Sequence, residues 1–191
     1  MIAVGQPNST TVNDYLAGEE ISETKREYIG GTVHAVAGAT NQHNSIATSA
    51  LLALGSQLRG KSCQPFNSDT KVRIEFPDHT RFYYPDAMVV SQTNPATDQF
   101  QNQPVVIIEI LSDSTRRADL GEKRDAYLTI SSLKALLFVE PDFPAVTLHR
   151  RMPEGGFASE CHTGIEAVIA LPEIEATLAL SDLYERVEFG A

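Results

Sequence analysis

Residues 105–111 read Val-Val-Ile-Ile-Glu-Ile-Leu, an apolar run whose single charge is Glu109. A continuous apolar run of this length is typical of a strand that is covered on both faces, as in the central sheet of an α/β protein. A second run, residues 82–90, reads Phe-Tyr-Tyr-Pro-Asp-Ala-Met-Val-Val and also contains one charge, Asp86. We therefore expect two buried strands, close together in sequence, that each carry one carboxylate.

The segments on either side alternate between helical and strand patterns. Apolar residues recur at helical spacing from Ile46 to Leu58, and Gly30-Gly31 suits a two-residue hairpin turn. The expected helices cover residues 12–18, 41–59 and 117–130. The expected strands cover residues 26–36 as a hairpin, 71–76, 82–90, 105–111, 135–140 and 146–150, with a loop at 91–104. This pattern predicts one α/β domain over residues 1–191, with an N-terminal helix within residues 1–20 and a peripheral acidic segment at 152–191.

The formal net charge of −10 at first argues against a nucleic-acid partner, because affinity for phosphates comes largely from clustered Lys and Arg. The charge is unevenly distributed, however. Residues 152–191 hold eight acids and one base, whereas the rest of the chain holds 14 bases and 17 acids. Enzymes that bind divalent cations also carry extra carboxylates. Net charge therefore neither supports nor excludes a nuclease.

No stretch approaches the roughly 18 apolar residues of a membrane span, and the N-terminus lacks a basic segment followed by an apolar run. These features predict a cytoplasmic protein without a membrane partner. Cys63 and Cys161 lack CxxC spacing, which indicates buried thiols of a reducing compartment rather than a zinc site. Asp69 and Lys71 precede an expected strand, and we interpret them as charges at the edge of that strand.

The two lone carboxylates, Asp86 and Glu109, are the main functional signal. A carboxylate in an apolar run is costly to bury unless it is paired, hydrogen-bonded or bound to a metal ion. For either acid alone, a metal ligand is about as good an explanation as a structural carboxylate that lies at a strand end in water or pairs with an arginine. The occurrence of both favours a shared metal site.

The nearest candidate cation lies on the helix that follows. Because side chains alternate along a strand, Leu111 shares a face with Glu109 and occupies the position of the lysine in a Glu-x-Lys arrangement. At 100° per residue, Lys123 and Tyr127 fall on one face of the expected helix, with Leu120 and Ile130. Lys123 is thus a candidate catalytic base or charge stabiliser, the alternative being a lysine that extends along apolar neighbours to water.

Tyr84-Pro85-Asp86 and the segment from Ile108 to Tyr127 resemble the core of the Uma-type restriction endonuclease family, a branch of the PD-(D/E)xK superfamily. The hairpin Lys25-Arg-Glu-Tyr-Ile-Gly-Gly and the helix start Gln42-His43-Asn44 resemble the N-terminal half of that family. The likeness runs from about Tyr15 to Tyr184. It implies a restriction-endonuclease-like α/β fold, in which a mixed central β-sheet is flanked by α-helices.

The resemblance also implies a site. Asp86, Glu109 and the backbone carbonyl of Ile110 would hold Mg²⁺, for which Mn²⁺ would substitute. Lys123 would be the lysine that has moved from the strand to the helix, and Glu27 matches an acid at the N-terminal edge of the superfamily core. Two departures are Gly30, where these proteins often have Asp, and the absence of the strand lysine. Further accessory candidates are His43, which is otherwise a core or cap histidine, Asp119 beside the face of Lys123, and Arg116, Arg117 and Arg124, which otherwise form a solvated helix face.

The leading hypothesis is a metal-dependent DNA endonuclease that hydrolyses phosphodiester bonds, acting by analogy as a homodimer. One alternative is a catalytically degenerate nuclease fold that binds nucleic acid or a protein partner. The missing strand lysine and the acidic segment favour that alternative. A third hypothesis is a metal-dependent phosphoesterase for small substrates, since the same carboxylates suit it.

Overall fold

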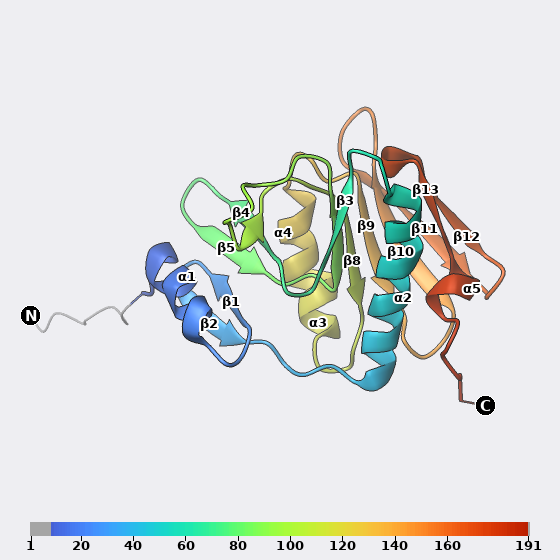
Figure 1. Ribbon diagram of the computed structural model, residues 1–191, viewed down its shortest axis with the longest axis horizontal. Coiled ribbons are helices and arrows are strands. Elements are labelled where there is room, and N and C mark those ends of the chain that lie inside the picture. The colour runs from blue at the N-terminus through green and yellow to red at the C-terminus, as the bar shows by residue number, and fades with distance from the viewer. Residues whose placement is uncertain (1–8, 191) are drawn as a thin grey trace, which may run out of the picture.

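The computed structural model describes residues 9–190, and it has the expected mixed α/β architecture, with two larger β-sheets, a two-stranded β-sheet and helices packed against them (Figure 1). Residues 1–8, on which the prediction about a secretory signal depends, lie outside the described range. No helix among the described residues is both long enough and apolar enough to span a membrane. The expectation of a single domain stays a prediction.

The helical elements are α1 (Val12–Ile21), α2 (Asn41–Leu58), α3 (Arg116–Ala118), a π-helical turn (Asp119–Lys123), α4 (Arg124–Leu128), a 3₁₀ turn (Pro172–Ile174) and α5 (Leu180–Leu183). The strands are β1 (Arg26–Ile29), β2 (Thr32–Ala35), β3 (Gln64–Asn67), β4 (Lys71–Glu75), β5 (Thr80–Tyr83), β6 (Ala87–Val90), β7 (Phe100–Gln101), β8 (Pro104–Ile110), β9 (Ala135–Val139), β10 (Ala145–Arg151), β11 (Phe157–Thr163), β12 (Val168–Leu171) and β13 (Ala176–Ala179).

The larger sheet has six strands in the order β11-β10-β9-β8-β6-β3, and the smaller has five in the order β2-β1-β5-β4-β7. In the larger sheet β8 and β9 are parallel and the other neighbours are antiparallel. A parallel pair needs a crossover connection, and α3, the π-helical turn and α4 provide it. The larger sheet is therefore the mixed central sheet that the sequence predicts.

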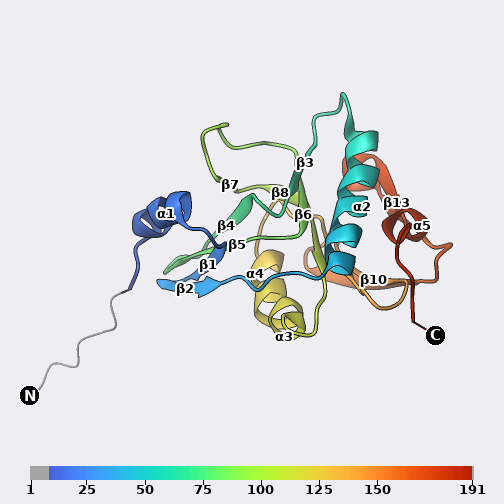
Figure 2. The ribbon, with the colours of Figure 1, turned by 60° about the horizontal axis from the view of Figure 1, so that its bottom comes forward.

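Helices cover both faces of this sheet (Figures 1 and 2). Side chains alternate along β8, so that Ile108 joins the core under α2, whereas Ile107 joins the core beside α4. The second core also takes in Val72 and Tyr83 of the smaller sheet. Glu109 shares the face of Ile107, which directs it toward the crossover helices and the smaller sheet.

Residues 82–90 do not form one strand, contrary to the prediction. β5 belongs to the smaller sheet and β6 to the central sheet, and Tyr84-Pro85-Asp86 connects them. Proline cannot donate a hydrogen bond to a strand neighbour, so it favours a break at this position. As a result Asp86 lies where the chain passes from one sheet to the other.

Three predicted boundaries are also wrong. The first helix runs past Gly18 to Ile21, and the loop at 91–104 contains the short strand β7. The helix predicted at 117–130 is interrupted by the π-helical turn, which is wider than an α-helical turn. The spacing of 100° per residue consequently fails from Asp119 to Lys123, where the site residues lie.

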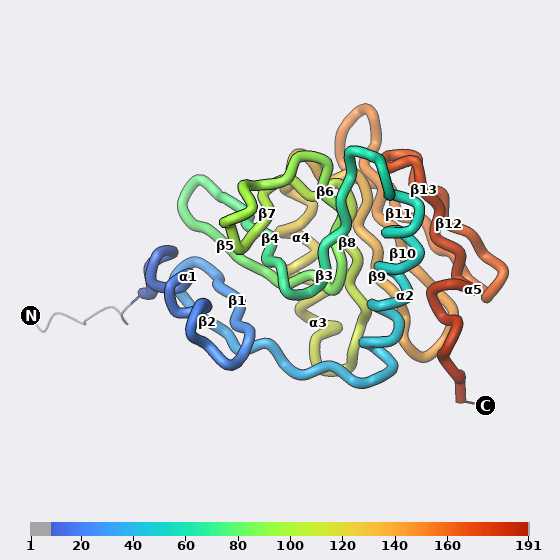
Figure 3. The backbone as a smooth tube through the Cα atoms, in the orientation of Figure 1, coloured from blue at the N-terminus to red at the C-terminus, as the bar shows by residue number. Residues whose placement is uncertain are grey.

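The acidic segment at 152–191 is not peripheral, and this prediction is wrong as well. β11 pairs with β10 along its whole length, and the β12–β13 hairpin and α5 pack beside α2 (Figure 3). Alternating side chains of this segment complete the core under α2: Ile169, Leu171, Ile174, Ala176, Leu178, Leu180, Leu183 and Tyr184. Most of the acids are exposed, whereas Glu160 and Glu173 pair with Arg150 of β10, so composition alone suggests a surface segment.

The cysteines differ from the prediction too. Cys161 is exposed on β11 and Cys63 is half-buried, so neither is a fully buried thiol. Both are free, and no disulfide joins them.

We expect Leu178→Ala to lower the free energy of unfolding by about 2–5 kcal/mol, because it opens a cavity in a fully buried position. Val168→Ala on the paired strand is the matched control. Its side chain is 56% exposed, and the expected change is below about 0.5 kcal/mol. Urea denaturation measures both, and equal small effects would contradict a core role for the acidic segment.

Candidate active site

Asp86 is anchored between the central sheet and α2. Its Oδ2 accepts a hydrogen bond from the backbone N–H of Ile110 at 2.8 Å, and His43 Nε2 lies 3.3 Å from the same oxygen. Ala87 pairs with Ile108 across the antiparallel strands β6 and β8, so the next step of the register brings Asp86 opposite Glu109. The structure therefore brings the two predicted carboxylates to one place.

His43 reaches the site because of how α2 begins. The Thr40 side chain accepts a hydrogen bond from the His43 backbone N–H at 3.2 Å and caps the helix. Burial opposes the charged imidazole, but Asp86 and the backbone carbonyl of Ile110 outweigh it and raise the pKa of His43 above its usual value. His43 Nδ1 is buried without a hydrogen-bond partner among the described residues. The ring thus faces both the Asp86 carboxylate and the Ile110 carbonyl.

Glu109 is only 3% exposed, on the apolar strand β8. Its Oε1 accepts a hydrogen bond from the Tyr127 hydroxyl at 2.7 Å, and that contact is buried. Burial raises the pKa of Glu109 well above its usual value, and the nearby acids Asp86 and Asp119 act in the same direction against the opposing effect of Lys123. A carboxylate in this position is ionised only when positive charge is close to it.

Lys123 supplies such a charge from the end of the π-helical turn. Its Nζ lies 2.8 Å from Glu27 Oε1, 3.5 Å from Asp119 Oδ1 and 3.7 Å from Glu109 Oε1. Burial alone would lower the pKa of Lys123, but these three carboxylates raise it far above its usual value. These contacts favour the ammonium form of Lys123, and of the two roles that the sequence left open they favour that of a charge stabiliser over that of a base.

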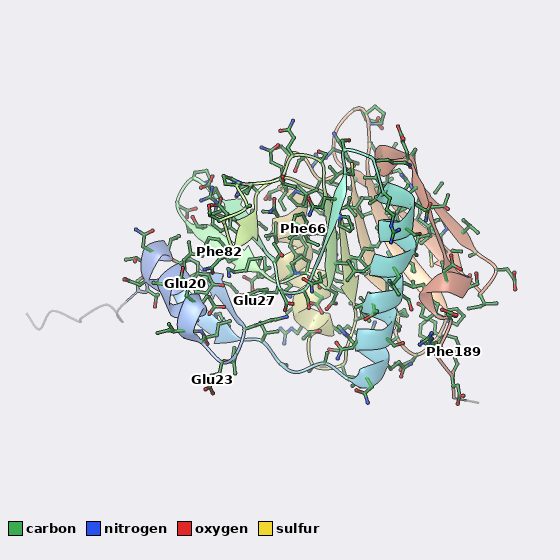
Figure 4. All side chains as sticks on the ribbon, in the orientation of Figure 1. Glu20, Glu23, Glu27, Phe66, Phe82 and Phe189 are labelled. Atoms are coloured by element: carbon green, nitrogen blue, oxygen red, sulfur yellow. The ribbon has the colours of Figure 1, made fainter. Side chains whose placement is uncertain are left out.

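Glu27 and Asp119 hold this ammonium from opposite elements. Glu27 lies on β1 of the smaller sheet, and it also accepts a hydrogen bond from the Tyr84 backbone N–H at 3.3 Å. Figure 4 shows Glu27 between the β1 hairpin and the crossover helices. Asp119 is 3% exposed, and the π-helical turn directs it inward with Lys123. Leu111, at the place of the absent strand lysine, is buried in the apolar core.

The charges of this group do not balance. Glu27, Glu109 and Asp119 surround Lys123, and Asp86 contacts His43, so four acids share one lysine and one histidine, and a further positive charge would help to keep all four ionised. A divalent cation fits this donor set, because hard ions prefer oxygen ligands. No group of three or more His, Cys, Asp or Glu side chains within residues 9–190 is arranged to hold an ion. Two carboxylates, one carbonyl and several waters are instead a set that suits Mg²⁺.

Two of the three arginines that the sequence offers as accessory residues already form ion pairs with acids of this chain. Arg116 makes a bidentate pair with Glu140, at 2.9 and 2.5 Å, and Arg124 pairs with Asp125 at 2.8 Å. Arg117 is exposed and makes no ion pair with any residue that the structure describes.

Sequence reasoning missed the roles of two tyrosines and misread one lysine. Helical spacing predicts Tyr127 on the inward face of its helix, but it does not predict the hydrogen bond from Tyr127 to Glu109. Lys123 also lies over the ring of Tyr83, 5.6 Å from its centroid. Lys71 is not an edge charge, because it is only 3% exposed. The short strand β7 covers β4 at Lys71, and because the sequence pattern predicts a loop there, no local signal reveals this burial.

Comparisons with known proteins identify a family and a fold for this chain. The model of the Uma2 family, described as "Putative restriction endonuclease", matches residues 12–181. The uncharacterized protein sll1609 of Synechocystis sp. is 29% identical over 143 residues, which cover 73% of this chain and 80% of that protein. A second uncharacterized Synechocystis protein, slr1290, is 28% identical over 143 residues, which cover 74% of each chain.

The fold has a solved counterpart. A crystal structure from Anabaena variabilis, described as a "putative nuclease belonging to DUF820", superposes with a TM-score of 0.72 and 19% identity over 92% of this chain and 97% of that one. At this identity the likeness shows the fold alone. The family model, in contrast, spans both carboxylate-bearing segments, the β1 hairpin and the turn that carries Lys123. The resemblance predicted from the sequence is thus confirmed, and the chain belongs to the Uma2 family of the restriction endonuclease type.

Proposed function

We propose that this protein is a metal-dependent endonuclease that hydrolyses phosphodiester bonds in DNA, with Mg²⁺ as its natural ion and Mn²⁺ as a substitute. The observation that supports this best is the surplus of buried carboxylates around Lys123. Membership of the Uma2 family supports the nuclease class. Restriction-endonuclease-like nucleases generally use divalent metals.

Asp86, Glu109 and the carbonyl of Ile110 would hold the ion. When bound, a divalent ion activates a water for in-line attack on the phosphodiester and offsets charge at the departing oxygen. The protein's own contribution is to fix its ligands. The Ile110 N–H and His43 orient Asp86, and the Tyr127 hydroxyl orients Glu109. Such supporting contacts commonly decide metal affinity and activity.

Lys123 would stabilise negative charge that develops on the phosphate during attack. A donor held in advance costs no reorganisation when charge develops, and burial strengthens its effect. Glu27 and Asp119 keep the ammonium in place. Because three carboxylates favour the ammonium form of Lys123, we assign proton removal from the attacking water to the solvent or to the substrate phosphate.

The exposed Arg117 is the candidate for contact with the substrate backbone, while Arg116 and Arg124 support the local structure through their ion pairs. Restriction-like nucleases that cut both strands of a duplex usually do so as dimers, so by analogy we also propose a homodimer. Location in the cytoplasm remains part of the same proposal.

Incubation with plasmid DNA and Mg²⁺ or Mn²⁺ tests the function directly. We expect the wild type to nick or linearise the plasmid, and Asp86→Asn to reduce the rate by more than about 100-fold, because it removes a proposed ligand. Asp125→Asn is the matched control. Asp125 is exposed and pairs with Arg124, so its loss should leave the rate unchanged.

Equal cleavage by the wild type and by Asp86→Asn would identify a contaminant and contradict the proposal. Calorimetry with Mn²⁺ provides a second criterion, since a folded protein that binds no divalent ion would be a degenerate nuclease fold. Cleavage of small phosphodiesters with little dependence on salt would instead indicate the phosphoesterase, because contacts to a phosphate backbone impose a steep salt dependence.

Tyr127→Phe isolates the contribution of one hydroxyl. We expect it to reduce metal-dependent cleavage by about 10–100-fold and to weaken Mn²⁺ binding, because Glu109 loses its hydrogen bond and its orientation. Tyr83→Phe is the control. The two rings pack together at 5.6 Å, but the Tyr83 hydroxyl contacts Arg81 and Glu122. Equal rates for the two variants would exclude Tyr127 as a positioning residue.

A further inference from the structure

A cavity of about 600 Å³ opens next to the candidate active site. Its walls come from α1, β3, the start of β4, Tyr84 and the loop between β6 and β7. Figure 4 shows two of its lining residues, Glu20 on α1 and Phe66 on β3. Neither the proposed metal ligands nor Lys123 line this cavity. It is therefore a separate site that shares one residue, Tyr84, with the segment leading to Asp86.

Lys71 lines this cavity and is 3% exposed. Its Nζ donates to the Tyr84 hydroxyl at 3.2 Å and to Gln99 Oε1 at 3.3 Å, and it lies over the Tyr84 ring at 5.1 Å. These partners are neutral, and Lys71 makes no ion pair with any residue from 9 to 190. Burial lowers the pKa of Lys71 as a result. An ammonium has three donors, so one remains for a ligand in the cavity.

The nearest acid does not pair with Lys71, because it is already engaged. Glu19 accepts from Arg26 Nε at 2.7 Å, from the Arg26 backbone N–H at 3.2 Å and from the Tyr84 hydroxyl at 2.7 Å. Glu19 thereby fixes Tyr84, and it acts on Lys71 only from beyond ion-pair distance. The buried lysine is thus a donor group held ready at the wall of a cavity.

The remaining charges around the cavity indicate what it binds. Glu20, Asp69 and Asp98 lie at its exposed rim. Glu20 accepts from Gln99 and Asp98 from Asn94, whereas Asp69 accepts from Asn67 and forms an ion pair with Lys25 at 2.7 Å, which offsets its charge. A carboxylate offers about four lone-pair sites, so each keeps acceptors for a ligand. Acids at the rim repel a phosphate, whereas they accept hydrogen bonds from a neutral ligand with amino groups. The ligand must also present an acceptor to Lys71 and a flat face to the ring of Phe66.

We propose that this cavity binds an unpaired guanine base of the nucleic-acid substrate. Guanine offers O6 and N7 as acceptors for an ammonium, and its N2 amino group and its Watson–Crick edge donate to carboxylates. Base recognition also suits an acidic chain, which is poorly equipped to follow a long run of phosphates. This inference rests on the proposed nuclease function and adds a preference for unpaired guanine near the cut.

Tyr84 links the cavity to the active site. Its hydroxyl contacts Lys71 and Glu19, while its backbone N–H donates to Glu27, the partner of Lys123. Pro85 and Asp86 follow directly in the chain. A strand whose base enters the cavity is consequently held beside the proposed metal ligands.

Fluorescence anisotropy with short labelled oligonucleotides tests the proposal. The probes are an oligothymidine and the same strand with a single central guanine or adenine, and EDTA is present so that nothing is cleaved. We expect the guanine strand to bind at least about tenfold more tightly than the other two, in line with discrimination at one well-recognised base. Equal binding of the three strands would overturn the proposal.

Lys71→Met should abolish the guanine preference, and Lys134→Met, at an exposed lysine that directly precedes β9 and does not line the cavity, should retain it. Glu20→Gln combined with Asp98→Asn changes only exposed side chains and should also reduce the preference, which keeps the test valid if Lys71→Met does not fold. Retention of the preference in both cavity variants would contradict the proposal.

Guanosine monophosphate distinguishes a base in a strand from a free nucleotide. If it competes as strongly as the guanine-containing strand, the ligand is the free nucleotide and the proposal is overturned. Because binding is measured without metal, a negative result here is separate from failure of plasmid cleavage. Calorimetric Mn²⁺ binding by Lys71→Met should match that of the wild type, since Lys71 contacts no proposed ligand.

Discussion

The site depends on the ion pairs of Lys123, because its ammonium joins three elements whose carboxylates would otherwise repel one another. Glu27 comes from the smaller sheet, Glu109 from the central sheet and Asp119 from the crossover helices. Removing one partner from a buried ion pair commonly costs about 3–5 kcal/mol, since the other charge is left uncompensated. The ammonium of Lys123 therefore joins the two sheets, and the same charge serves the proposed chemistry.

The residues Tyr84-Pro85-Asp86 make this arrangement possible. They carry the chain from one sheet to the other. This one connection places the Tyr84 hydroxyl beside Lys71, the Tyr84 backbone N–H beside Glu27 and the Asp86 carboxylate in the active site. Substrate recognition and catalysis would then share one rigid support. A site built on strand ends in this way is better fixed than one built on free loops.

Much of the site could be predicted because its signals are local. Glu109 is a single charge in an apolar strand, and alternation along that strand directs it toward the helix of Lys123. The break between β5 and β6 could not be predicted, since an apolar run does not reveal which sheet each half joins. The π-helical turn at Asp119, the burial of Lys71 and the core role of the acidic segment all depend on long-range contacts, which local patterns do not encode.

The packing of β12, β13 and α5 against α2 has a consequence for how the chain folds during synthesis. Chains emerge N-terminus first, and α2 is made long before the strands that cover it. Until residues up to Tyr184 have left the ribosome, the apolar face of α2 that holds Ile46 and Leu54 lacks its final partners. The nascent chain therefore exposes an apolar, aggregation-prone surface until late in translation, when a ribosome-associated chaperone could cover it. His43 of the candidate active site lies in the first turn of that same helix, so the helix that carries it gains its last packing partners at the end of synthesis.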